Sequence, residues 1–327
     1  MGCEAGLLNR DELILNEMRI LIADDLHAKG LEILSTALQV DDRAGISPET
    51  LLDAIPKYDA LIVRGRTKVG VKVFAAGKRL KVVGRAGVGA DNIDLAAAKA
   101  RGVIVVNAPK AATLAVAEHT LGLMLALARM IPRADVSMKA GEWVKKDLAG
   151  VELNNKVLGV IGLGNIGSAV AHRAEFLGLK VLGYDPHLSM DEMFRWGAEP
   201  AALVDLFARA DFVSLHVPLI PETRGMIDAQ ALGNMKPGVR LICTARGGII
   251  DERALLDALE SGHVAGAALD VFAQEPPGMT ALVSHPNVIA TPHIGAQTVE
   301  AQARAAEDIA MEVKVALSGG TLRWRVV

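Results

Sequence analysis

A glycine-rich turn between two apolar segments constrains the fold of this chain more than any other feature. Residues 157–161 form an apolar, branched run with the length of a buried strand, and they lead directly into the motif Gly162-x-Gly164-x-x-Gly167. Apolar residues then recur at helical spacing, and a second apolar run ends at Asp185. This order predicts a βαβ unit with an acidic residue after its second strand.

Each glycine of this turn has a physical role in binding a dinucleotide. Gly162 allows the tight turn, Gly164 lets the backbone approach a pyrophosphate, and Gly167 lets the helix pack close to the strand. The pyrophosphate would bind N–H groups at the helix N-terminus, where the helix dipole also favours an anion. Asp185 would accept hydrogen bonds from ribose hydroxyls and repel the 2′-phosphate of NADP. A GxGxxG motif alone is a weak signal, but with its flanking strands, helix and acid it predicts an NAD site.

Composition excludes several classes of protein. The net charge of -3 provides no basic field of the kind that nucleic acid requires. No apolar run reaches the length of a membrane span, and no segment has the features of a signal peptide. Cys3 and Cys243 are the only cysteines, and they make neither a disulfide framework nor a metal site. We therefore expect a cytoplasmic protein that binds neither nucleic acid nor membrane and holds no metal.

The first part of the chain alternates predicted strands and helices, which favours an open parallel sheet. No glycine fingerprint follows its first strand, where Asp24 and Asp25 stand instead. The predicted strands are 19–23, 60–63, 81–83 and 103–106, and the predicted helices are 27–37, 48–55 and 95–101. Two loops at strand ends, 63–67 and 84–92, are candidate substrate contacts, because ligands of open sheets bind at the carboxyl ends of strands.

At 327 residues the chain is long enough for two domains. After the glycine motif five more apolar strands follow, which would give a six-stranded NAD-binding domain over residues 112–298. The last predicted helix, 299–317, would return to cover the first sheet, so that 18–111 and 299–327 form one discontinuous domain. The predicted fold class is α/β, with two Rossmann-like domains and parallel sheets. The NAD domain is inserted into a smaller, flavodoxin-like substrate domain, and residues 1–17 are an extension that we expect to be disordered.

A long apolar helix is predicted over residues 112–130, ending at Pro132. Glu118 and His119 within it are interpreted as a satisfied polar pair of the core rather than as ligands. The following segment, 134–150, contains Trp143 and is amphipathic and loosely structured. We expect it to form a subunit contact in a homodimer or homotetramer.

Three residues could support hydride transfer between a nicotinamide and a hydroxy acid. This reaction needs a group that binds the carboxylate and a group that acts as acid and base. Arg246 follows an apolar strand beside two glycines and suits bidentate binding of a carboxylate, although a solvated loop arginine is the alternative. His293 ends the last strand and could equally be a structural hydrogen-bonder. Glu275 could orient that imidazole and stabilise its protonated form, or it could be an exposed loop acid. Spacing alone does not establish the pairing.

Several longer stretches resemble the NAD-dependent D-2-hydroxyacid dehydrogenases. They are the glycine motif with Asp185, residues 243–251, residues 268–277 and residues 292–296, and the likeness covers about residues 18–320. Within the family it is greatest to the D-3-phosphoglycerate dehydrogenases, through residues 61–64, 82–94, 137–143 and 265–272. The resemblance implies Arg246 as ligand of the substrate carboxylate, His293 as acid and base, and Glu275 as its partner.

The same resemblance implies the remaining contacts of cofactor and substrate. NAD contacts would come from Gly162, Gly164, Asn165, Ile166, Gly167, Asp185, Val88, Val217, Thr244, Ala245, Asp270, Gly295 and Ala296. Substrate contacts would come from Arg64, Gly65, Arg85, Gly87, Val88 and Lys145, with Arg64 and Arg85 on a phosphate. Two positions depart from the family pattern, because Lys145 or Lys146 stands where several members carry an arginine, and Cys243 stands where many carry asparagine.

The activity that the resemblance implies is the NAD-dependent oxidation of D-3-phosphoglycerate to 3-phosphohydroxypyruvate, the first step of serine biosynthesis. Two alternatives stay open at this stage. The first is a dehydrogenase or reductase of another small acid, such as glyoxylate, hydroxypyruvate or 2-oxoglutarate. The second is an NAD-regulated binding protein similar to the family's corepressors. The end of the chain soon after Trp324 is compatible with a short unregulated form or with a truncated chain.

Overall fold

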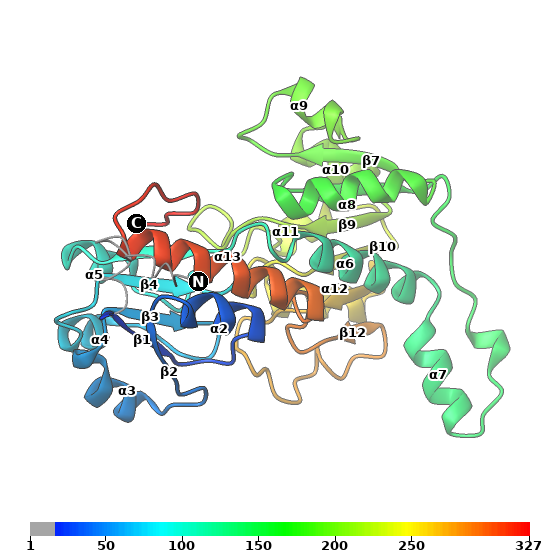
Figure 1. Cartoon of the computed structure of the whole chain (residues 1–327). Helices are drawn as coiled ribbons and strands as arrows, with labels where there is room; N and C mark the ends of the chain where they lie inside the picture. The colour runs from blue at the N-terminus through cyan, green and yellow to red at the C-terminus, as the bar shows by residue number, and fades with distance from the viewer. Residues whose placement is uncertain (1–16) are drawn as a thin grey trace, which may run out of the picture. The chain divides into compact units, whose positions relative to one another are not determined.

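The computed structural model describes residues 17–327, which divide into two compact units. One unit comprises the described residues up to Ala112 together with Gln297–Val327, and the other comprises Thr113–Ala296. Each unit contains one sheet whose described strand pairs are all parallel (Figure 1). This confirms the predicted α/β class. The prediction for the N-terminal extension lies, up to residue 16, outside the described residues.

The first unit contains a five-stranded sheet with the order β2-β1-β3-β4-β5, which is the flavodoxin-like order. Its strands are β1 (Arg19–Ile22), β2 (Gln39–Asp42), β3 (Ala60–Val63), β4 (Val82–Arg85) and β5 (Ile104–Asn107). Successive side chains of a strand point to opposite faces, so Leu21 joins one apolar core and Ile22 the other.

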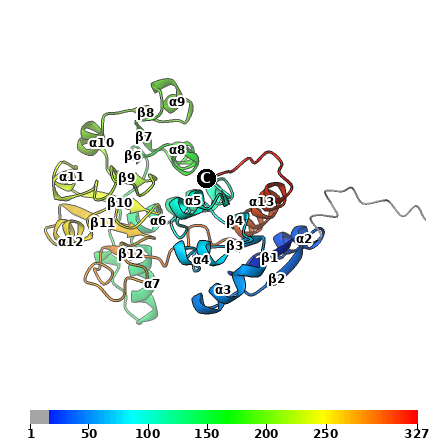
Figure 2. The same cartoon turned by 90° about the vertical axis from the view of Figure 1, so that its left-hand side faces the viewer.

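Helices cover both faces of this sheet, as Figure 2 shows. One face packs against α3 (Pro48–Ala54), α4 (Val71–Ala76) and α5 (Leu95–Ala100), with a 3-10 helix, η1 (Ile55–Lys57), after α3. The other face packs against α2 (Ala28–Ser35) and α13 (Val299–Leu317). The last helix of the chain therefore returns to the first sheet, as predicted.

The second unit contains a seven-stranded sheet with the order β12-β11-β10-β9-β6-β7-β8. Its strands are β6 (Val157–Ile161), β7 (Lys180–Tyr184), β8 (Glu199–Pro200), β9 (Phe212–Leu215), β10 (Val239–Cys243), β11 (Val264–Leu269) and β12 (Val288–Ala290). The chain leaves β6 in one direction and later returns beside it as β9, so the order reverses there. A reversal of this kind is where open α/β sheets bind their ligands.

The helices of the second unit lie on both faces of its sheet (Figure 2). The core of one face includes α6 (Thr113–Ala128), α8 (Asn165–Phe176) and α9 (Met190–Arg195), through buried residues such as Met124 and Val170. The core of the other includes α10 (Leu203–Arg209), α11 (Ala229–Gly233) and α12 (Glu252–Glu260), through residues such as Leu206 and Leu255. A single dinucleotide-type sheet is thus enclosed by two apolar layers.

The sequence-based assignment missed two strands and several short helices. Strand β2 has the polar sequence QVDD and lies at the edge of its sheet, and β8 is only two residues long. Neither shows the apolar run that marks a buried strand, so the prediction of six strands for the NAD domain was one too few. Helix α4 was also missed, because its N-cap is Gly70 and it lacks a capping side chain such as Asp94, which precedes the equally short α5.

The long apolar helix predicted over residues 112–130 also differs in the structure. It ends at Ala128, Met130 takes a left-handed conformation with φ 53°, and α7 (Ile131–Lys139) follows at an angle of 64°. Pro132 therefore lies in the first turn of a new helix, where its missing N–H costs nothing, instead of ending the old one. In residues 17–327 no single helix is both long and apolar enough to cross a membrane, although the bent pair α6 and α7 would be by length and composition.

The C-terminal segment pairs with the edge of the first sheet. Val106 and Arg325 form an antiparallel bridge, and Val326 N–H donates to the carbonyl oxygen of Val105 at 2.8 Å. Glu312, which is 1% exposed, anchors this segment by accepting hydrogen bonds from the backbone N–H groups of Arg323 and Trp324. The edge strand β5 is thereby protected from pairing with another chain.

We predict that the close packing of α2 on α13 makes Gly30 intolerant of a side chain. A Cβ at residue 30 would lie 2.9 Å from the carbonyl oxygen of Ala306, a contact with backbone that cannot easily move. Alanine improves helix propensity by about 1 kcal/mol, but overpacking costs about 1–3 kcal/mol. Gly30→Ala should therefore lower the free energy of unfolding, measured in urea.

The matched control is Gly122→Ala in α6, an exposed position where a Cβ would meet nothing within 4 Å. This variant should raise the free energy of unfolding, because only the helix propensity changes. Equal stabilisation by both substitutions would contradict the packing argument.

Candidate functional site

The glycine turn of the second unit has the geometry of a dinucleotide-binding turn. Gly162 follows β6 with φ 88°, and Gly164 is the N-cap of α8 with no capping side chain. A Cβ at residue 167 would lie only 1.8 Å from the carbonyl oxygen of Gly162, whereas one at residue 164 would meet nothing within 4 Å. Gly167 thus permits close packing, and Gly164 leaves space before the helix N-terminus. That space and the uncapped N–H groups fit a pyrophosphate.

Asp185 lies just after β7 and ties the glycine turn to that strand. One of its carboxylate oxygens accepts a hydrogen bond from Leu163 N–H at 2.9 Å, and the other accepts from His187 N–H at 3.0 Å. A carboxylate offers about four lone-pair sites, so acceptor capacity is left for ribose hydroxyls. The residue that was predicted to contact ribose also braces the turn that would hold the pyrophosphate.

His216 is a partly buried residue of this site to which the sequence reasoning gave no role. Its carbonyl oxygen and Cγ1 of Val217 lie within 3.0 Å of the place where Gly162 would carry a Cβ. Its Nε2 forms a hydrogen bond with Oγ of Ser214 at 2.8 Å, and burial lowers the pKa of His216 to about 4. The imidazole beneath the turn is therefore neutral at neutral pH. Its place directly after β9, at the point where strand order reverses, is the signal that could have found it.

The Arg246 loop follows β10 and is fixed by short contacts. Thr244 turns its hydroxyl inward to Thr120 of α6 at 2.9 Å, and Nη1 of Arg246 donates to the carbonyl oxygen of Ala245 at 2.7 Å. A Cβ at Gly247 would lie 1.8 Å from the carbonyl oxygen of Phe272. Only glycine allows this loop to pack against the segment that leads to Glu275.

Cys243, at the end of β10, is a buried thiol without a reactive environment. Burial raises its pKa to about 11, so the thiolate is not populated at neutral pH.

Glu275 and His293 form the pair that the sequence suggested without establishing. Nδ1 of His293 lies 2.8 Å from Oε2 of Glu275, and Oε1 of Glu275 accepts from Phe272 N–H at 3.1 Å. His293 has a left-handed backbone with φ 53°, an uncommon conformation for a residue with a side chain. With Nδ1 occupied by Glu275, Nε2 is the ring atom that can gain or lose a proton.

Asp270 holds the loop that contains His293. Its carboxylate is 1% exposed and accepts hydrogen bonds from the backbone N–H groups of Ile294, at 2.9 Å, and Gly295, at 2.8 Å. It also bonds the Thr291 hydroxyl and lies 3.3 Å from Nε2 of His119. Burial alone would raise the pKa of Asp270, but the hydrogen bonds from His119, Thr291 and the loop amides keep it below its ordinary value. A buried carboxylate thus shapes the loop that the resemblance assigned to NAD.

Glu118 and His119, the polar pair of α6, differ in burial. His119 is partly buried and joins the Asp270 network, as expected for a satisfied core residue. Glu118 is exposed, so the expectation of a core interaction was wrong for this residue. A helix turns 100° per residue, so at this position His119 faces the Asp270 network while Glu118 faces away from it.

In the first unit, the arginines of the predicted substrate loops stand at adjacent strand ends. Val63 of β3 pairs with Arg85 of β4, and Arg64 follows directly after β3. Among the described residues 17–327, the guanidinium of Arg64 has only long contacts, 3.4 Å to Oε1 of Gln297 and 3.5 Å to the carbonyl oxygen of Asp25. Arg66, in contrast, donates to the carbonyl oxygen of Ala23 at 2.7 Å. Arg64 is therefore the arginine of this loop that can turn to a ligand.

Gly87 makes room for the side chain of Arg85. A Cβ at residue 87 would lie 1.5 Å from Nη1 of Arg85, so only glycine allows the guanidinium to fold over this turn. The turn is held from β5, because Nδ2 of Asn107 donates to the carbonyl oxygen of Val88 at 2.6 Å. Asn107 was not singled out in the sequence, since nothing there shows which loop its amide faces.

The predicted site residues thus fall into two groups. The second unit brings together the loops that carry Arg246, Asp270, Glu275, His293 and Gly295, and the first unit places Arg64 and Arg85 on neighbouring strands. Lys145 lies exposed in a short 3-10 helix, η2 (Lys145–Asp147), and forms no hydrogen bond to either group within residues 17–327.

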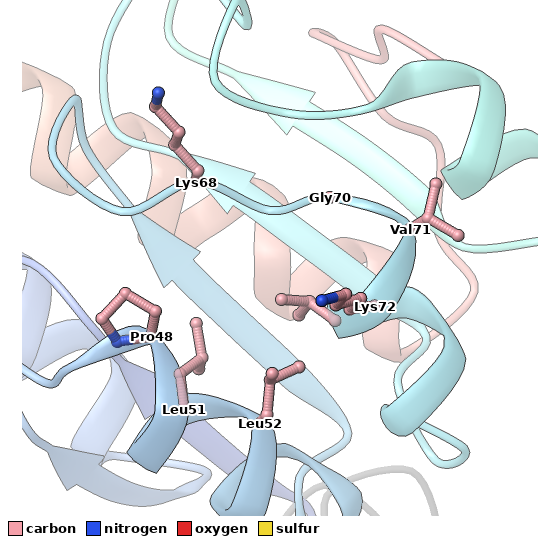
Figure 3. Close-up of a pocket in the computed structure, with 8 residues that line it drawn as sticks. Pro48, Leu51, Leu52, Lys68, Gly70, Val71 and Lys72 are labelled. Carbon is pink, nitrogen blue, oxygen red and sulfur yellow. The ribbon is translucent and has the colours of Figure 1, made fainter.

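A pocket of about 270 Å³ in the first unit contains none of these residues. Its lining is mostly apolar and comes from α3, from the loop before α4 and from the start of α4: Pro48, Leu51, Leu52, Lys68, Gly70, Val71, Lys72 and Val73. Figure 3 shows the ammonium group of Lys68 pointing away from the leucines. Lys68 and Lys72 are the only ionisable side chains among the lining residues, and none of the residues expected to act in hydride transfer lies there, so the pocket is not a candidate for that chemistry.

We predict that two glycines of the turn have separable roles in NAD binding. Gly164→Ala should leave the melting temperature unchanged and lower the affinity for NAD by about tenfold or more. The reason is that its Cβ would occupy only the space proposed for the pyrophosphate. Gly167→Ala should lower both the melting temperature and NAD affinity, because its Cβ would meet the Gly162 carbonyl at 1.8 Å. Thermal unfolding and titration of protein fluorescence with NAD measure the two effects. Unchanged NAD affinity in Gly164→Ala would contradict this assignment.

Comparisons with known proteins agree with this geometry. The chain is 48% identical over 301 residues to a D-3-phosphoglycerate dehydrogenase from Synechocystis sp., covering 92% of this chain and 54% of that relative. The chain thus spans about half the length of the curated relatives that it matches. Two crystal structures align over 95% of this chain. The TT0316 protein from Thermus thermophilus has a TM-score of 0.86, 35% identity and all of its chain covered. A glyoxylate reductase from Paecilomyes thermophila has a TM-score of 0.87, 30% identity and 98% of its chain covered.

A family model also matches the unit that holds the glycine turn. It is described as the NAD binding domain of D-isomer specific 2-hydroxyacid dehydrogenases, and it covers residues 121–295. That range includes the glycine turn, Asp185 and the loops of Arg246, Glu275 and His293. The match, the solved relatives and the geometry of the turn lead to one conclusion: the chain belongs to the D-isomer specific 2-hydroxyacid dehydrogenase family and carries its NAD-binding domain.

Proposed function

We propose that this chain catalyses the reversible NAD-dependent oxidation of D-3-phosphoglycerate at carbon 2. The observation that carries the proposal is the hydrogen-bonded pair Glu275–His293, next to the Arg246 loop, in a unit with an NAD-binding turn. The substrate is supported by the arginines at two strand ends of the other unit and by relatives that are named D-3-phosphoglycerate dehydrogenases at 45–48% identity. We further propose that this other unit is the substrate-binding domain.

In the oxidation, three residues of the second unit would act on the hydroxy acid. Arg246 would bind the substrate carboxylate, because a guanidinium can form two parallel hydrogen bonds with it. His293 would take the hydroxyl proton at Nε2, and Glu275 would stabilise the resulting imidazolium through Nδ1. NAD, when bound, accepts the hydride from carbon 2. In the reverse direction the same imidazolium would return the proton to the carbonyl oxygen.

Arg64 and Arg85 would bind the phosphate of the substrate. A phosphate carries nearly two negative charges at neutral pH, and guanidinium groups match its geometry better than ammonium groups do. Gly65 and Gly87 keep the backbone of the two loops clear of side chains, and Lys145 is proposed as a further, weaker contact. None of these residues is needed for hydride transfer itself, so they would decide which hydroxy acid is used.

A reductase of an unphosphorylated 2-oxo acid is the second candidate function. It is favoured by the similarity to the structure of a glyoxylate reductase, with a TM-score of 0.87. The acid–base pair and Arg246 would serve either reaction, because both substrates present a carboxylate beside the reacting carbon. The candidates therefore differ in whether Arg64 and Arg85 meet a ligand.

The test is turnover of purified protein with NAD and D-3-phosphoglycerate, followed by the absorbance of NADH. We expect turnover of this substrate, with a smaller kcat/KM for D-lactate, because only the phosphorylated acid can engage Arg64 and Arg85. Arg85→Ala should raise KM for D-3-phosphoglycerate by about 10- to 100-fold, the loss of one or two charge-assisted hydrogen bonds. Its effect on glyoxylate should be within about twofold.

Two results would remove this proposal. Absence of turnover with D-3-phosphoglycerate, alongside good turnover of an unphosphorylated acid, would assign the chain to the second candidate function. Equal effects of Arg85→Ala on phosphorylated and unphosphorylated substrates would take Arg85 out of a phosphate site.

We also propose that the protein is a homodimer or homotetramer that contacts a second copy through α7 and the segment after it. This region exposes Ile131, Val136 and Met138, and Trp143 is 78% exposed. Several exposed apolar side chains within one short stretch of chain are typical of a protein–protein surface. The cytoplasmic location expected from the sequence stays a prediction.

Trp143→Glu should shift the assembly toward the monomer, because it places a charge within an apolar contact. Phe176→Glu is the matched control, since Phe176 is 81% exposed in the same unit but lies outside this region. Light scattering after size-exclusion chromatography measures both. A monomeric parent protein, or an unchanged mass for Trp143→Glu, would exclude this contact.

A further inference from the structure

Asp24 is a buried carboxylate directly below the loop that carries Arg64. It follows β1 at the carboxyl edge of the first sheet and is 4% exposed. Oδ2 accepts hydrogen bonds from Arg64 N–H at 2.7 Å and from Thr67 N–H at 3.1 Å, and Oδ1 accepts from the Thr67 hydroxyl at 2.6 Å. Both ends of the loop 64–67 are thus attached to one side chain.

Asn92 holds the same loop through its carbonyl groups. Its Nδ2 donates to the carbonyl oxygen of Arg64 at 2.9 Å and to that of Thr67 at 2.7 Å. The backbone N–H groups and carbonyl groups at both ends of the loop are therefore satisfied without any ligand. Such a loop presents its side chains from a preset backbone, which reduces the entropy lost on binding.

Arg66 neutralises the charge of Asp24. Its Nη2 lies 3.1 Å from Oδ1 of Asp24, and its Nε donates to the same oxygen at 3.2 Å. Without this ion pair, the Asp24 carboxylate would repel an anion that approaches the loop. Because Arg66 is committed to Asp24, the charge that the loop offers to a ligand is that of Arg64.

We propose that Asp24 is a positioning residue that presets Arg64 to bind the anionic group of the substrate distal to the reacting carbon. This inference rests on the proposed function, in which that group is the phosphate of D-3-phosphoglycerate. Asp24 itself touches no substrate, and it acts through the loop alone. The loop is thus a binding element whose conformation is set by a buried acid on the neighbouring strand.

An amide cannot replace this carboxylate. Each group that Asp24 contacts here is a donor: two backbone N–H groups, one hydroxyl and one guanidinium. In Asp24→Asn one of the two oxygen positions becomes an NH₂ group, which faces either the two backbone N–H groups or the Arg66 guanidinium, so the contacts at that position are lost. The substitution preserves the shape of the side chain and weakens the attachment of the loop.

Asp59 provides a matched control. It is also 4% exposed in the same unit, and it also accepts a backbone N–H, that of Arg19 at 3.0 Å, and a guanidinium, that of Arg79 at 2.9 Å. It precedes β3, however, and lies at the amino edge of the sheet, away from the loop. Asp59→Asn should therefore cost stability in the same way without altering substrate selection.

The experiment compares D-3-phosphoglycerate with D-glycerate, which differ only in the phosphate. Asp24→Asn should raise KM for D-3-phosphoglycerate about tenfold and leave kcat, and KM for D-glycerate, within about twofold. Asp59→Asn should leave KM for D-3-phosphoglycerate and KM for D-glycerate unchanged. Thr67→Val, a milder change that removes only the hydroxyl contact to Asp24, should have a smaller effect of the same kind, and it replaces Asp24→Asn if that variant does not fold. Equal changes for both substrates would overturn the proposal.

A double-variant cycle tests whether Asp24 acts through Arg64. If it does, Asp24→Asn combined with Arg64→Ala should have the KM of Arg64→Ala alone, within about twofold. Effects that multiply would show independent roles and overturn the proposal.

Failure of the proposed function is distinguished by a binding measurement. If the parent protein does not oxidise D-3-phosphoglycerate, that function falls, and the same variants are titrated with inorganic phosphate by calorimetry. The parent protein should bind phosphate. Asp24→Asn and Arg64→Ala should lower the affinity for phosphate to the same extent, and Asp59→Asn should leave it unchanged. No binding by the parent, or unchanged binding by Asp24→Asn, would overturn the role of Asp24.

Discussion

Parallel strand pairing is the constraint on which the rest of this structure depends. Parallel neighbours must be joined by crossover connections, so every loop that follows a strand emerges at the same edge of its sheet. In the second unit this edge carries the glycine turn after β6, the Arg246 loop after β10 and His293 after β12. In the first unit it carries Asp24 after β1 and Arg64 after β3. Residues far apart in the sequence meet because their strands are neighbours.

Buried or partly buried acids recur as the residues that hold these loops in place. Asp24 holds the Arg64 loop, Asp185 the glycine turn, Asp270 the loop after His293, and Glu312 the C-terminal segment. Each accepts backbone N–H groups that no helix or strand satisfies, and a carboxylate can accept several at once. Loops that must present charged side chains are thereby fixed without using those side chains. The same device explains why acids at the ends of strands need not contact a ligand.

Short-range chemistry explains which parts of the fold could be predicted. The apolar strands, the glycine turn and the helix over 299–317 are specified by local patterns, and they were predicted with small errors at their ends. Strands β2 and β8 were missed because they lie at sheet edges and need no apolar run. The bend at Met130 was missed because Pro132 was taken to end the helix, whereas it lies in the first turn of α7.

The sequence by itself determined the fold class, the NAD-binding turn and the set of residues that could perform hydride transfer, because each of these depends on residue type at short spacing. It did not determine which of these side chains interact with one another. Whether Glu275 faces His293, whether Arg64 or Arg66 is left for a ligand, and what Asp24 and Asp270 hold are decided only by the tertiary structure. The physical reason is that a hydrogen bond depends on the distance and direction between two atoms. For residues that are tens of positions apart, strand order and loop packing set both.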